Sequence, residues 1–519
     1  MWMRCAAIFA ALFFVTLPVI APAQDVTLRS RDGSVELSGD LLGFDGEFYR
    51  LRTQYGELTV DGSGVLCEGV GCPSLTDFVA QLSISGSATI GSVLMPALIE
   101  AFALRNGLTS ARETIDDTHF VYLLNRRDTG KRAGQFSFRV TNTDEGFADL
   151  LADEADIVMA MREIRPAEAE LAREAGLGRL DAANRSRVLA LDAVVPVVGA
   201  GNPIGAISLL DLSRVLSGRL TNWRELGGPD APVVLHMRDP GSGLSQGVED
   251  RLLQPEGLTL RDDVLRHKSN ADLVAAVARD PFGIGLASFS DLGNTRPMVL
   301  TGNCGFQLRA ARRTIKTEDY PLTSPMFLYL PARRLPALAR EFLAFTRTQP
   351  AQIVIRRAGF VDQAPEEVPV DFQGDRFANA IRVAEGEAGL SALRQMTETL
   401  ADLRRLTTSF RFETGSARLD AQSRSNVQQL ARALEAGAYD TRRLLFVGFS
   451  DGQGPAEPNL QIARRRAEAV RQAVLEAAET LDPDRLTITT EAFGEAMPMA
   501  CDDTSWGRGV NRRVEVWLD

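Results

Sequence analysis

The sequence predicts a multidomain α/β protein, with a small β domain at the N-terminus and α/β regions after it. The chain has 519 residues, which is too long for a single hydrophobic core. Short alternating runs separated by Asp-Gly pairs occupy residues 26–62, and Asp-Gly between such runs is typical of β-hairpins. From Leu82 onward, strand-like runs alternate with helix-like runs, which is the pattern of an α/β fold.

The composition narrows the range of functions. Apolar residues make up 45% of the chain and charged residues 24%, as in ordinary globular proteins. The formal net charge of −11 argues against a nucleic-acid partner and against simple attraction to an anionic membrane surface. His119, His236 and His267 are scattered, and no cysteine or histidine spacing suits zinc. We therefore expect neither a metal nor a cofactor.

Residues 1–23 have the pattern of a secretory signal peptide. Arg4 precedes an apolar run over residues 6–17, and Ala21-Pro-Ala23 supplies small residues for cleavage. The apolar run is too short for a comfortable membrane span, and no later run reaches that length. We expect an exported, soluble mature chain.

Export implies an oxidising compartment, in which cysteines form disulfides. The exported chain keeps Cys67, Cys72, Cys304 and Cys501. Cys67 and Cys72 are close enough to close a small loop and are the first choice of pair. Four cysteines allow three connectivities, and the sequence does not choose among them.

Residues 24–75 are expected to form the small β domain. Its hairpins suggest a compact barrel that resembles an SH3 or Sm-like fold only loosely. A docking or packing module is the role we favour for it.

Two segments between residues 80 and 362 have the pattern of an anion site. Residues 85–91 and 238–243 each follow a strand and open a helix, and they are rich in small polar residues. Free backbone N–H groups at a helix N-terminus suit an anion, although small residues also cap ordinary helices.

These two segments, with Thr221-Asn-Trp223 and residues 156–162, resemble the periplasmic phosphate-binding protein of ABC importers. The resemblance covers residues 80–362 and implies two α/β lobes, the second at about residues 190–280, with the ligand in the cleft between them. It implies a set of anion-binding residues: Thr89, Ile90 through its N–H, Thr143, Arg238, Ser242 and Gly243. Two positions depart from the family. Met161 stands where phosphate binders keep an aspartate that accepts the proton of the bound phosphate, and Leu244 replaces a threonine.

An enzyme interpretation rests on residues 243–247, which match the G-x-S-x-G nucleophile motif between a strand and a helix. A hydrolase also needs a histidine and an acid later in the chain, and His267 is the only histidine downstream of this motif. We therefore expect Ser245 to open a helix and the protein not to be an enzyme.

Residues 363–405 are expected to form a linker and a helix. The linker is acidic and contains proline, and residues 390–403 carry an apolar stripe at helical spacing. Packing against the next domain is the favoured role of this stripe, with a short coiled coil as the alternative.

Residues 406–519 resemble the OmpA-like domain that binds the peptidoglycan stem peptide. The resemblance is carried by residues 410–419, Gly448–Gly454, residues 463–467 and Gly507–Arg513. It implies that Asp451 binds the ammonium of diaminopimelate and Arg466 its carboxylate, with support from Asn459 and Arg512. A carboxylate beside the fork of an arginine suits a ligand that carries both charges on one carbon.

Together these patterns predict a non-enzymatic protein of the periplasm, on the outer-membrane side, attached to peptidoglycan. Its middle cleft is expected to take a small anion, with phosphate as the first candidate. The alternative is a structural scaffold whose cleft has lost its ligand and which docks an envelope protein.

Overall fold

The computed structural model describes residues 25–74, 78–182, 184–384, 386–413, 416 and 418–519. The expected signal peptide lies outside these residues, as do residues 414, 415 and 417 of the stretch 410–419. The described chain forms two compact units that meet at Ala80 and Gln81. Along the described chain, no helix is both long and apolar enough to cross a membrane.

The first unit is a five-stranded antiparallel sheet with the strand order β4-β3-β2-β1-β5. Its strands are β1 (Asp25–Ser30), β2 (Glu36–Phe44), β3 (Phe48–Thr53), β4 (Gly56–Asp61) and β5 (Val65–Glu68). Gly33 and Gly46 have φ of 72° and 97°, so two of the Asp-Gly pairs make turns that need glycine. The third pair, at Asp61, instead starts a single 3-10 turn, and Asp61 caps it. A disulfide joins Cys67 to Cys72, whose Cα atoms lie 5.8 Å apart.

The second unit contains the middle domain (residues 81–362) and the C-terminal domain (residues 363–519). The middle domain is built on one large mixed sheet, in the order β14-β13-β15-β11-β19-β10-β6-β9-β8-β7. Its strands are β6 (Ala80–Ser87), β7 (Leu108–Thr114), β8 (His119–Arg126), β9 (Arg132–Thr141), β10 (Ile157–Ala160), β11 (Ser186–Val198), β13 (Val234–Arg238), β14 (Leu265–His267), β15 (Gly283–Ser288), β16 (Arg296–Pro297), which pairs with β11, and β19 (Thr323–Tyr329).

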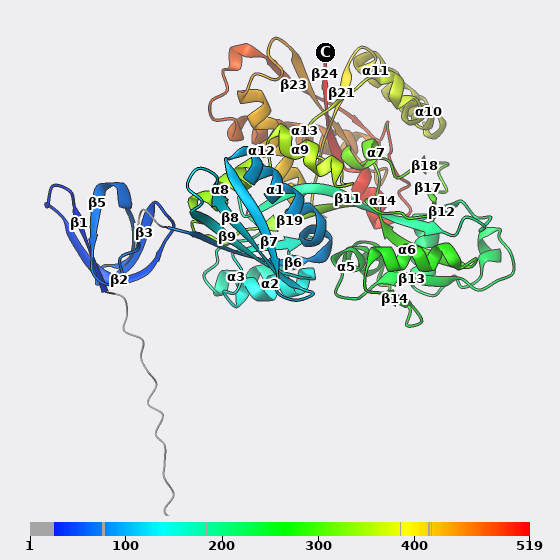
Figure 1. Ribbon diagram of the computed structural model, residues 1–519. Helices are drawn as coiled ribbons and strands as arrows, with labels where there is room; N and C mark the ends of the chain where they lie inside the picture. The colour runs from blue at the N-terminus through cyan, green and yellow to red at the C-terminus, as the bar shows by residue number, and fades with distance from the viewer. Residues whose placement is uncertain (1–24, 75–77, 183, 385, 414–415, 417) are drawn as a thin grey trace, which may run out of the picture. The chain divides into compact units, whose positions relative to one another are not determined.

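Strand β11 joins the two lobes of the middle domain (Figure 1). Residues 186–193 pair with β19 in the first lobe, and residues 194–198 pair with β15 in the second. Every residue of β11 from Leu189 to Val198 is buried, and all of them except Asp192 are apolar, as is usual for a strand covered on both faces. A smaller sheet of β12 (Ala206–Ser208), β17 (Val299–Thr301) and β18 (Gln307–Leu308) extends the second lobe beyond the expected boundary near residue 280.

Helices cover the middle domain. They are α1 (Met95–Arg105), α2 (Thr143–Leu151), α3 (Pro166–Glu174), α4 (Leu209–Leu216), α5 (Gly243–Val248), α6 (Asn270–Arg279), α7 (Arg312–Lys316), α8 (Ala337–Phe345) and α9 (Gln349–Arg357). A π-helical turn, Ile90–Leu94, leads into α1, and a second one, Glu249–Leu253, continues α5.

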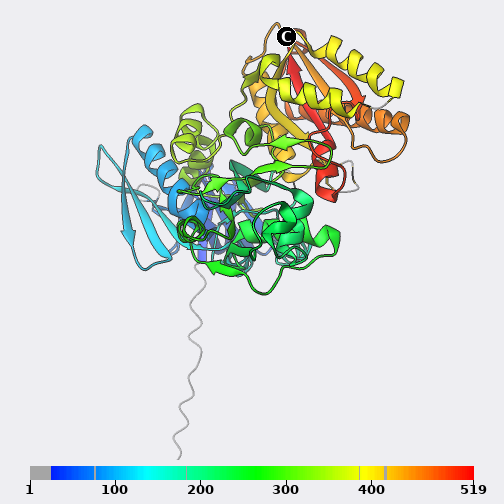
Figure 2. The same ribbon diagram turned by 90° about the vertical axis from the view of Figure 1, so that its right-hand side faces the viewer.

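The C-terminal domain has a five-stranded sheet in the order β20-β21-β24-β22-β23, with helices on both faces (Figures 1 and 2). Its strands are β20 (Glu367–Val368), β21 (Arg404–Arg411), β22 (Arg443–Phe449), β23 (Thr487–Gly494) and β24 (Arg513–Leu518), and its helices are α10 (Gly374–Val383), α11 (Gly386–Leu400), α12 (Ala421–Glu435), α13 (Ala456–Ala477) and α14 (Ser505–Asn511).

Residues 363–405 are not a free linker. Residues 367–368 form β20, which pairs with β21 at the edge of the sheet. Met396 and Leu400 of α11 are buried against Val447 and Trp517. The acidic and proline-containing composition suggested a linker, but β20 makes part of it a strand of the C-terminal sheet. The apolar stripe packs against that sheet, which is the role favoured for it.

Candidate binding sites

The strand β22 ends at the first candidate site, which we call the Asp451 site. The Asp451 carboxylate follows this buried strand, and Arg512 directly precedes β24, the neighbouring strand in the sheet. Arg512 Nη1 lies 2.7 Å from Asp451 Oδ2, and both side chains are mostly buried, at 19% and 13% exposure. The sheet therefore brings together two residues that are 61 positions apart.

Asn459 and Arg466 on α13 complete the expected group. Asn459 Nδ2 donates to the carbonyl oxygens of Asp451 and Gln453 at 3.3 and 3.0 Å, so it holds the Gly-rich turn against the helix. The Arg466 guanidinium lies 5.2 Å from the centre of the Phe412 ring. Burial lowers the pKa of Arg466, the positive charge of Arg512 lowers it further, and Asp451 acts in the opposite sense. All four expected residues thus lie in one place.

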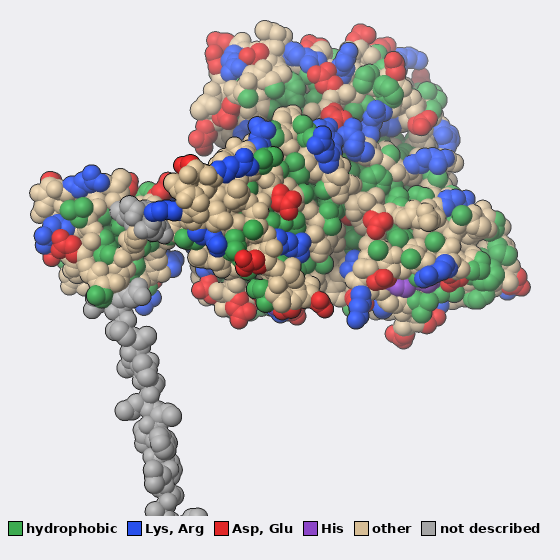
Figure 3. All heavy atoms as spheres, viewed as in Figure 1, with side chains coloured by type: hydrophobic (Ala, Val, Ile, Leu, Met, Phe, Trp, Pro, Cys, Tyr) green, Lys and Arg blue, Asp and Glu red, His purple; other side chains and the backbone are tan. Residues whose placement is uncertain are grey.

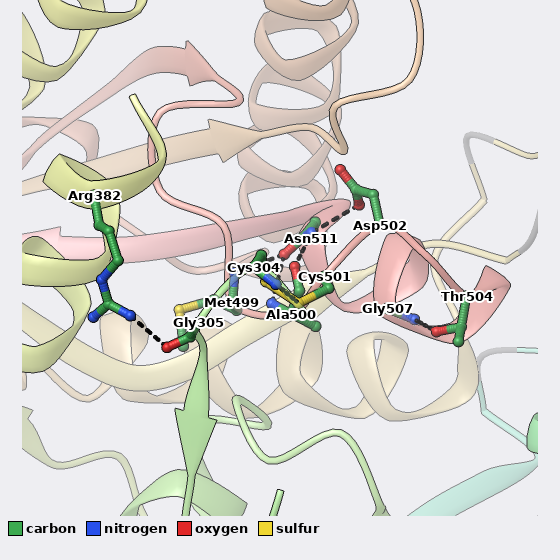
Figure 4. Close-up of a disulfide and its surroundings, with 10 residues drawn as sticks. All are labelled: Cys304, Gly305, Arg382, Met499, Ala500, Cys501, Asp502, Thr504, Gly507 and Asn511. Atoms are coloured by element: carbon green, nitrogen blue, oxygen red, sulfur yellow. Dashed lines mark hydrogen bonds between the residues drawn. A yellow bond between two sulfur atoms is a disulfide. The ribbon is translucent and has the colours of Figure 1, made fainter. Parts of the chain in front are cut away.

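Asp502 and Asn511 also support this site, and only Asn511 belonged to a motif noted in the sequence. Asp502 accepts hydrogen bonds from the Gly452 N–H at 2.6 Å and from Asn511 Nδ2 at 2.9 Å. Figure 4 shows the second of these bonds. The fully buried Asn511 in turn accepts from the N–H groups of Met499 and Ala500. No local pattern marks Asp502, because its partners lie far away in the sequence.

A cavity of about 480 Å³ adjoins the Asp451 site, and we call it the Trp506 cavity. Arg512 and Phe412 line it from the C-terminal domain, and Glu163 and Arg251 line it from the middle domain. Arg251 lies 5.8 Å from the centre of the Trp506 ring. Arg512 therefore belongs both to the Asp451 site and to the lining of a space that both domains share.

The second candidate site lies in the cleft of the middle domain. β6 and β10 are parallel neighbours, with Gly86 opposite Met159, so their carboxyl ends meet at one edge of the sheet. Thr89 follows β6 and precedes the π-helical turn in which Ile90 is buried. The fully buried Thr143 begins α2, and its hydroxyl oxygen accepts from the Met161 N–H at 3.2 Å.

The two lobes touch at Gly243. A Cβ atom at Gly243 would lie 2.5 Å from Thr143 Oγ1 and 2.7 Å from Met161 Cβ, so only glycine fits there. Ser242 is the residue before α5, and its side chain makes no capping hydrogen bond. Thr143, Ser242 and Gly243 are therefore brought together from both lobes.

Arg238 takes a different position from the one expected. Its Nε and Nη2 donate to the carbonyl oxygens of His267 and Lys268 at 3.3 and 2.8 Å, within the second lobe. Burial lowers the pKa of this guanidinium. The described contacts thus direct Arg238 toward β14 and its following residue, and none joins it to Thr89 or Thr143.

Arg162 is a cleft residue whose role the sequence did not indicate. Its guanidinium is 2% exposed and pairs with Asp144 at 2.5 Å and Glu168 at 2.6 Å. Burial alone lowers the pKa of Arg162, but the hydrogen bonds and charges of Glu168 and Asp144 outweigh it and raise the pKa. Its Nε also donates to Gln246 of the second lobe at 3.0 Å.

The nucleophile interpretation finds no support in these contacts. The Ser245 hydroxyl donates to the carbonyl of Arg238 at 3.1 Å. His267 Nε2 lies 3.0 Å from His236 Nδ1, and His236 Nε2 lies 3.2 Å from Asp280. No Ser-His pair forms among the described contacts. Nor does any group of three or more His, Cys, Asp or Glu in the described chain have an arrangement that could hold a metal ion.

Both large domains match models of known protein families. A family model described as a PBP superfamily domain matches residues 76–348, and one described as the OmpA family matches residues 411–512. The first match covers more than half of the chain, so the protein belongs to the PBP superfamily, with an OmpA-family domain at its C-terminus.

Individual relatives agree with this assignment. "Protein SphX" of Synechococcus elongatus is 27% identical over 234 residues, which are 43% of this chain and 67% of that protein. "Phosphate-binding protein PstS" of Borreliella burgdorferi is 23% identical over 182 residues, 34% of this chain and 65% of its own length. "Outer membrane protein A" of Bordetella avium is 32% identical over 105 residues, 20% of this chain and 51% of its own.

The matched part thus spans between about half and two thirds of these relatives' own lengths. A solved structure of an ABC-type phosphate transport receptor from Vibrio cholerae covers 54% of this chain and 99% of its own, with 19% identity and a TM-score of 0.41. None of these relatives is named as an enzyme.

Proposed function

We propose that the protein is a periplasmic binding protein attached to peptidoglycan, with a cleft for a small anion. In this proposal the Asp451 site binds the diaminopimelate of the stem peptide, on the outer-membrane side of the periplasm. The observation that carries the proposal is the convergence of Asp451, Asn459, Arg466 and Arg512 around one turn. The cleft between the lobes takes the anion, and phosphate is the first candidate.

The chemistry of the Asp451 site favours a ligand with both charges. A mostly buried carboxylate attracts an ammonium, and an arginine fork suits a carboxylate. Arg512 already pairs with Asp451, so an incoming ammonium must share that carboxylate. Arg466 then offers its guanidinium to the ligand's carboxylate, over the face of Phe412.

Attachment to the cell wall is tested by replacing the Asp451 carboxylate with an amide of the same shape. Asp451→Asn in the full chain is expected to weaken sedimentation with purified peptidoglycan at least about tenfold. A hydrogen bond to a charged group contributes about 1.5–3 kcal/mol, which corresponds to this factor. Asp484→Asn is the matched control, because Asp484 is an exposed aspartate elsewhere in the same domain. Equal sedimentation of both variants with peptidoglycan would refute the assignment of the Asp451 site.

Anion binding is tested by calorimetry of the full chain with phosphate and with sulfate. We expect both to bind, with affinities within about tenfold of each other, because Met161 supplies no acceptor for the proton of phosphate and strong discrimination needs such a group. Ser242→Ala is expected to weaken binding, while Ser217→Ala in the same lobe is the control. Strong preference for phosphate would contradict this account of Met161.

A second candidate function, an envelope scaffold, is favoured by the Arg162 contacts. Two carboxylates already compensate this buried guanidinium, and Arg165 of the first lobe pairs with Asp250 of the second at 3.1 Å. These contacts hold the lobes together without a ligand. Absence of heat with both anions, together with intact peptidoglycan binding, would favour a scaffold that docks an envelope protein.

A further inference from the structure

A second cavity, of about 460 Å³, lies between the middle and C-terminal domains, and we call it the α10 cavity. The segment from β17 to α7 lines it from the middle domain, and the residues of α10 line it from the other side. It is separate from the cleft and from the Asp451 site. The Cys304–Cys501 disulfide lies close by: Arg382 of the cavity wall donates to the Gly305 carbonyl at 2.6 Å, next to Cys304 (Figure 4).

Positive charge dominates the wall of the α10 cavity. Five arginines line it, against two aspartates, Asp319 and Asp375. The arginines are Arg309, Arg313, Arg376, Arg382 and Arg405. Arg309, Arg313 and Arg382 are exposed and form a rim, while Arg376 and Arg405 are buried at the base. On the face drawn in Figure 3, basic side chains gather over α7 and α9, where the two domains meet.

The base of the cavity belongs to a buried charge cluster that has more cations than anions. The cluster consists of Arg376, Arg405, Arg513, Asp319 and Glu515, each at most 9% exposed. Arg405 pairs with Asp319 at 2.6 Å, and Arg513 pairs with Glu515 at 2.7 Å. Arg376 shares Glu515 with Arg513. A buried charge without a partner is costly, and three guanidinium groups face two carboxylates here.

The pKa values of the three arginines shift in different directions. Burial lowers the pKa of Arg405, but the charges of Asp319 and Glu515 outweigh it and raise the pKa. Burial, and then the charge of Arg405, lower the pKa of Arg376, while Glu515 and Asp319 oppose the shift. Burial lowers the pKa of Arg513 to about 10.

Two buried amides beside this cluster have polar atoms without partners. Asn379 is 3% exposed, and within the described part of the chain neither its Nδ2 nor its Oδ1 has a hydrogen-bond partner. Gln373 is 2% exposed, and its Oε1 accepts from Arg376, so the amide orientation is set and Nε2 is the unpaired end. Both residues line the cavity. Buried polar atoms are paired in nearly all proteins, so the two unpaired donors, Gln373 Nε2 and Asn379 Nδ2, point to a bound polar group.

Another part of the wall is apolar. Phe306 and Leu308 come from the middle domain, and Met499 comes from the C-terminal domain. Phe372 is 65% exposed and lies under the Arg313 guanidinium at 4.4 Å. A ligand that fills this space must therefore have an apolar body as well as a charged group.

We propose that the α10 cavity binds a small amphipathic organic anion. The anionic group meets Arg376, Gln373 Nε2 and Asn379 Nδ2, and it compensates the excess positive charge of the cluster. The apolar body lies against Phe306, Leu308 and Phe372. Inorganic phosphate fits this site poorly, because it has no apolar part and gains nothing from that wall.

The test uses 8-anilinonaphthalene-1-sulfonate, an aromatic sulfonate whose fluorescence rises in apolar surroundings, with the native full chain. We expect saturable binding that octanoate displaces and millimolar inorganic phosphate does not. Asn379→Leu is expected to weaken this binding at least about tenfold, because a hydrogen bond to a charged group is lost. Its melting temperature without the probe is expected to stay the same or rise, because an unpaired buried amide is removed.

A surface variant keeps the test valid if Asn379→Leu fails to fold. Arg309→Gln removes one rim charge, and Arg357→Gln on α9 removes the same charge away from the cavity wall. We expect the first to weaken binding several-fold and the second to leave it unchanged. Equal affinity of Arg309→Gln and the unchanged protein, absence of saturable binding, or displacement by phosphate would each overturn the proposal. The phosphate calorimetry described above reports on the cleft between the lobes. It therefore distinguishes loss of binding in the α10 cavity from loss of anion binding in the cleft.

Discussion

At the scale of the residue, the junction of the two domains is held by charged side chains that are buried. Arg405 of β21 forms a bidentate ion pair with Asp319 of the middle domain, with N–O distances of 2.6 and 2.9 Å. Glu318, next to it, is 8% exposed and lies 3.8 Å from Arg411. Burial raises the pKa of the Glu318 carboxyl to about 8, although Arg411 opposes this shift.

The raised pKa of Glu318 predicts a pH dependence of stability. The unfolded carboxyl titrates near about 4.5, so the folded state binds more protons than the unfolded state up to about pH 8. The stability that the protonated Glu318 carboxyl contributes is therefore complete below about pH 4.5 and is lost as the pH rises through about 8. Glu318→Gln should make the melting temperature fall less steeply than in the unchanged protein over this range.

Scanning calorimetry at several pH values measures how the melting temperature changes with pH in the unchanged protein and in Glu318→Gln. Glu163 and Asp192 also have raised pKa values, about 7 and about 6, both caused mainly by burial. Glu318→Gln should therefore remove only part of the fall in melting temperature with rising pH. Parallel curves for the two proteins would contradict the role of Glu318.

At the scale of the element, β22 shows how one strand organises the C-terminal domain. Leu444 and Phe446 pack with α12 and α13, whereas Leu445 and Val447 pack with α11, because successive side chains of a strand point to opposite faces. The sheet is therefore covered on both sides. Helix α11 is a structural layer of the domain and not a spacer.

Met396 tests this role of α11, because it is fully buried in the second layer. Met396→Ala is expected to lower the free energy of unfolding by about 2–5 kcal/mol, the usual cost of a cavity in a core. Glu398→Ala on the exposed side of the same helix should change it by less than about 0.5 kcal/mol. Urea unfolding of both variants provides the comparison. Equal stabilities would mean that α11 is not part of the core.

At the scale of the whole molecule, residues 81–519 form one compact unit because several contacts tie the two domains together. A disulfide joins Cys304 of the middle domain to Cys501 of the C-terminal domain, with Cα atoms 5.7 Å apart. Asp502, which holds the turn of the Asp451 site, directly follows Cys501. The disulfide therefore links the middle domain to the support of that site.

Loss of this disulfide is expected to separate the unfolding of the two domains. Closing a loop of 197 residues is worth up to about 5 kcal/mol in the chain-entropy account. The variant Cys304→Ser/Cys501→Ser should unfold at lower temperature in calorimetry, with a split transition. Cys67→Ser/Cys72→Ser, within the first unit, is the matched control and should leave the transition of residues 81–519 unchanged. One unsplit transition at the original temperature would contradict this role.

Local signals in the sequence predicted much of the architecture. The Asp-Gly turns, the alternation of strands and helices, and the Gly-rich turn after β22 each depend on neighbouring residues. For that reason the positions of Asp451, Asn459, Arg466 and Arg512 followed from motifs before any contact was known. The strand-to-helix segments at residues 85–91 and 238–243, one in each lobe, were found in the same way.

Other features depended on pairing over long distances. The Arg162 contacts, the turn of Arg238 toward β14, and the support from Asp502 join residues that no short pattern connects. Residues 363–405 have a linker-like composition, and they become part of the fold only because they cover an apolar face of the C-terminal sheet.

The sequence by itself determined the class of each domain, the family resemblance and the residues of the Asp451 site. The tertiary structure alone decided the second disulfide, the covering of the C-terminal sheet and the α10 cavity. The physical reason is that turns, caps and periodicity are short-range properties of the chain. Burial, charge balance and the pairing of polar atoms depend on which distant segments meet, and that is settled only when the core forms.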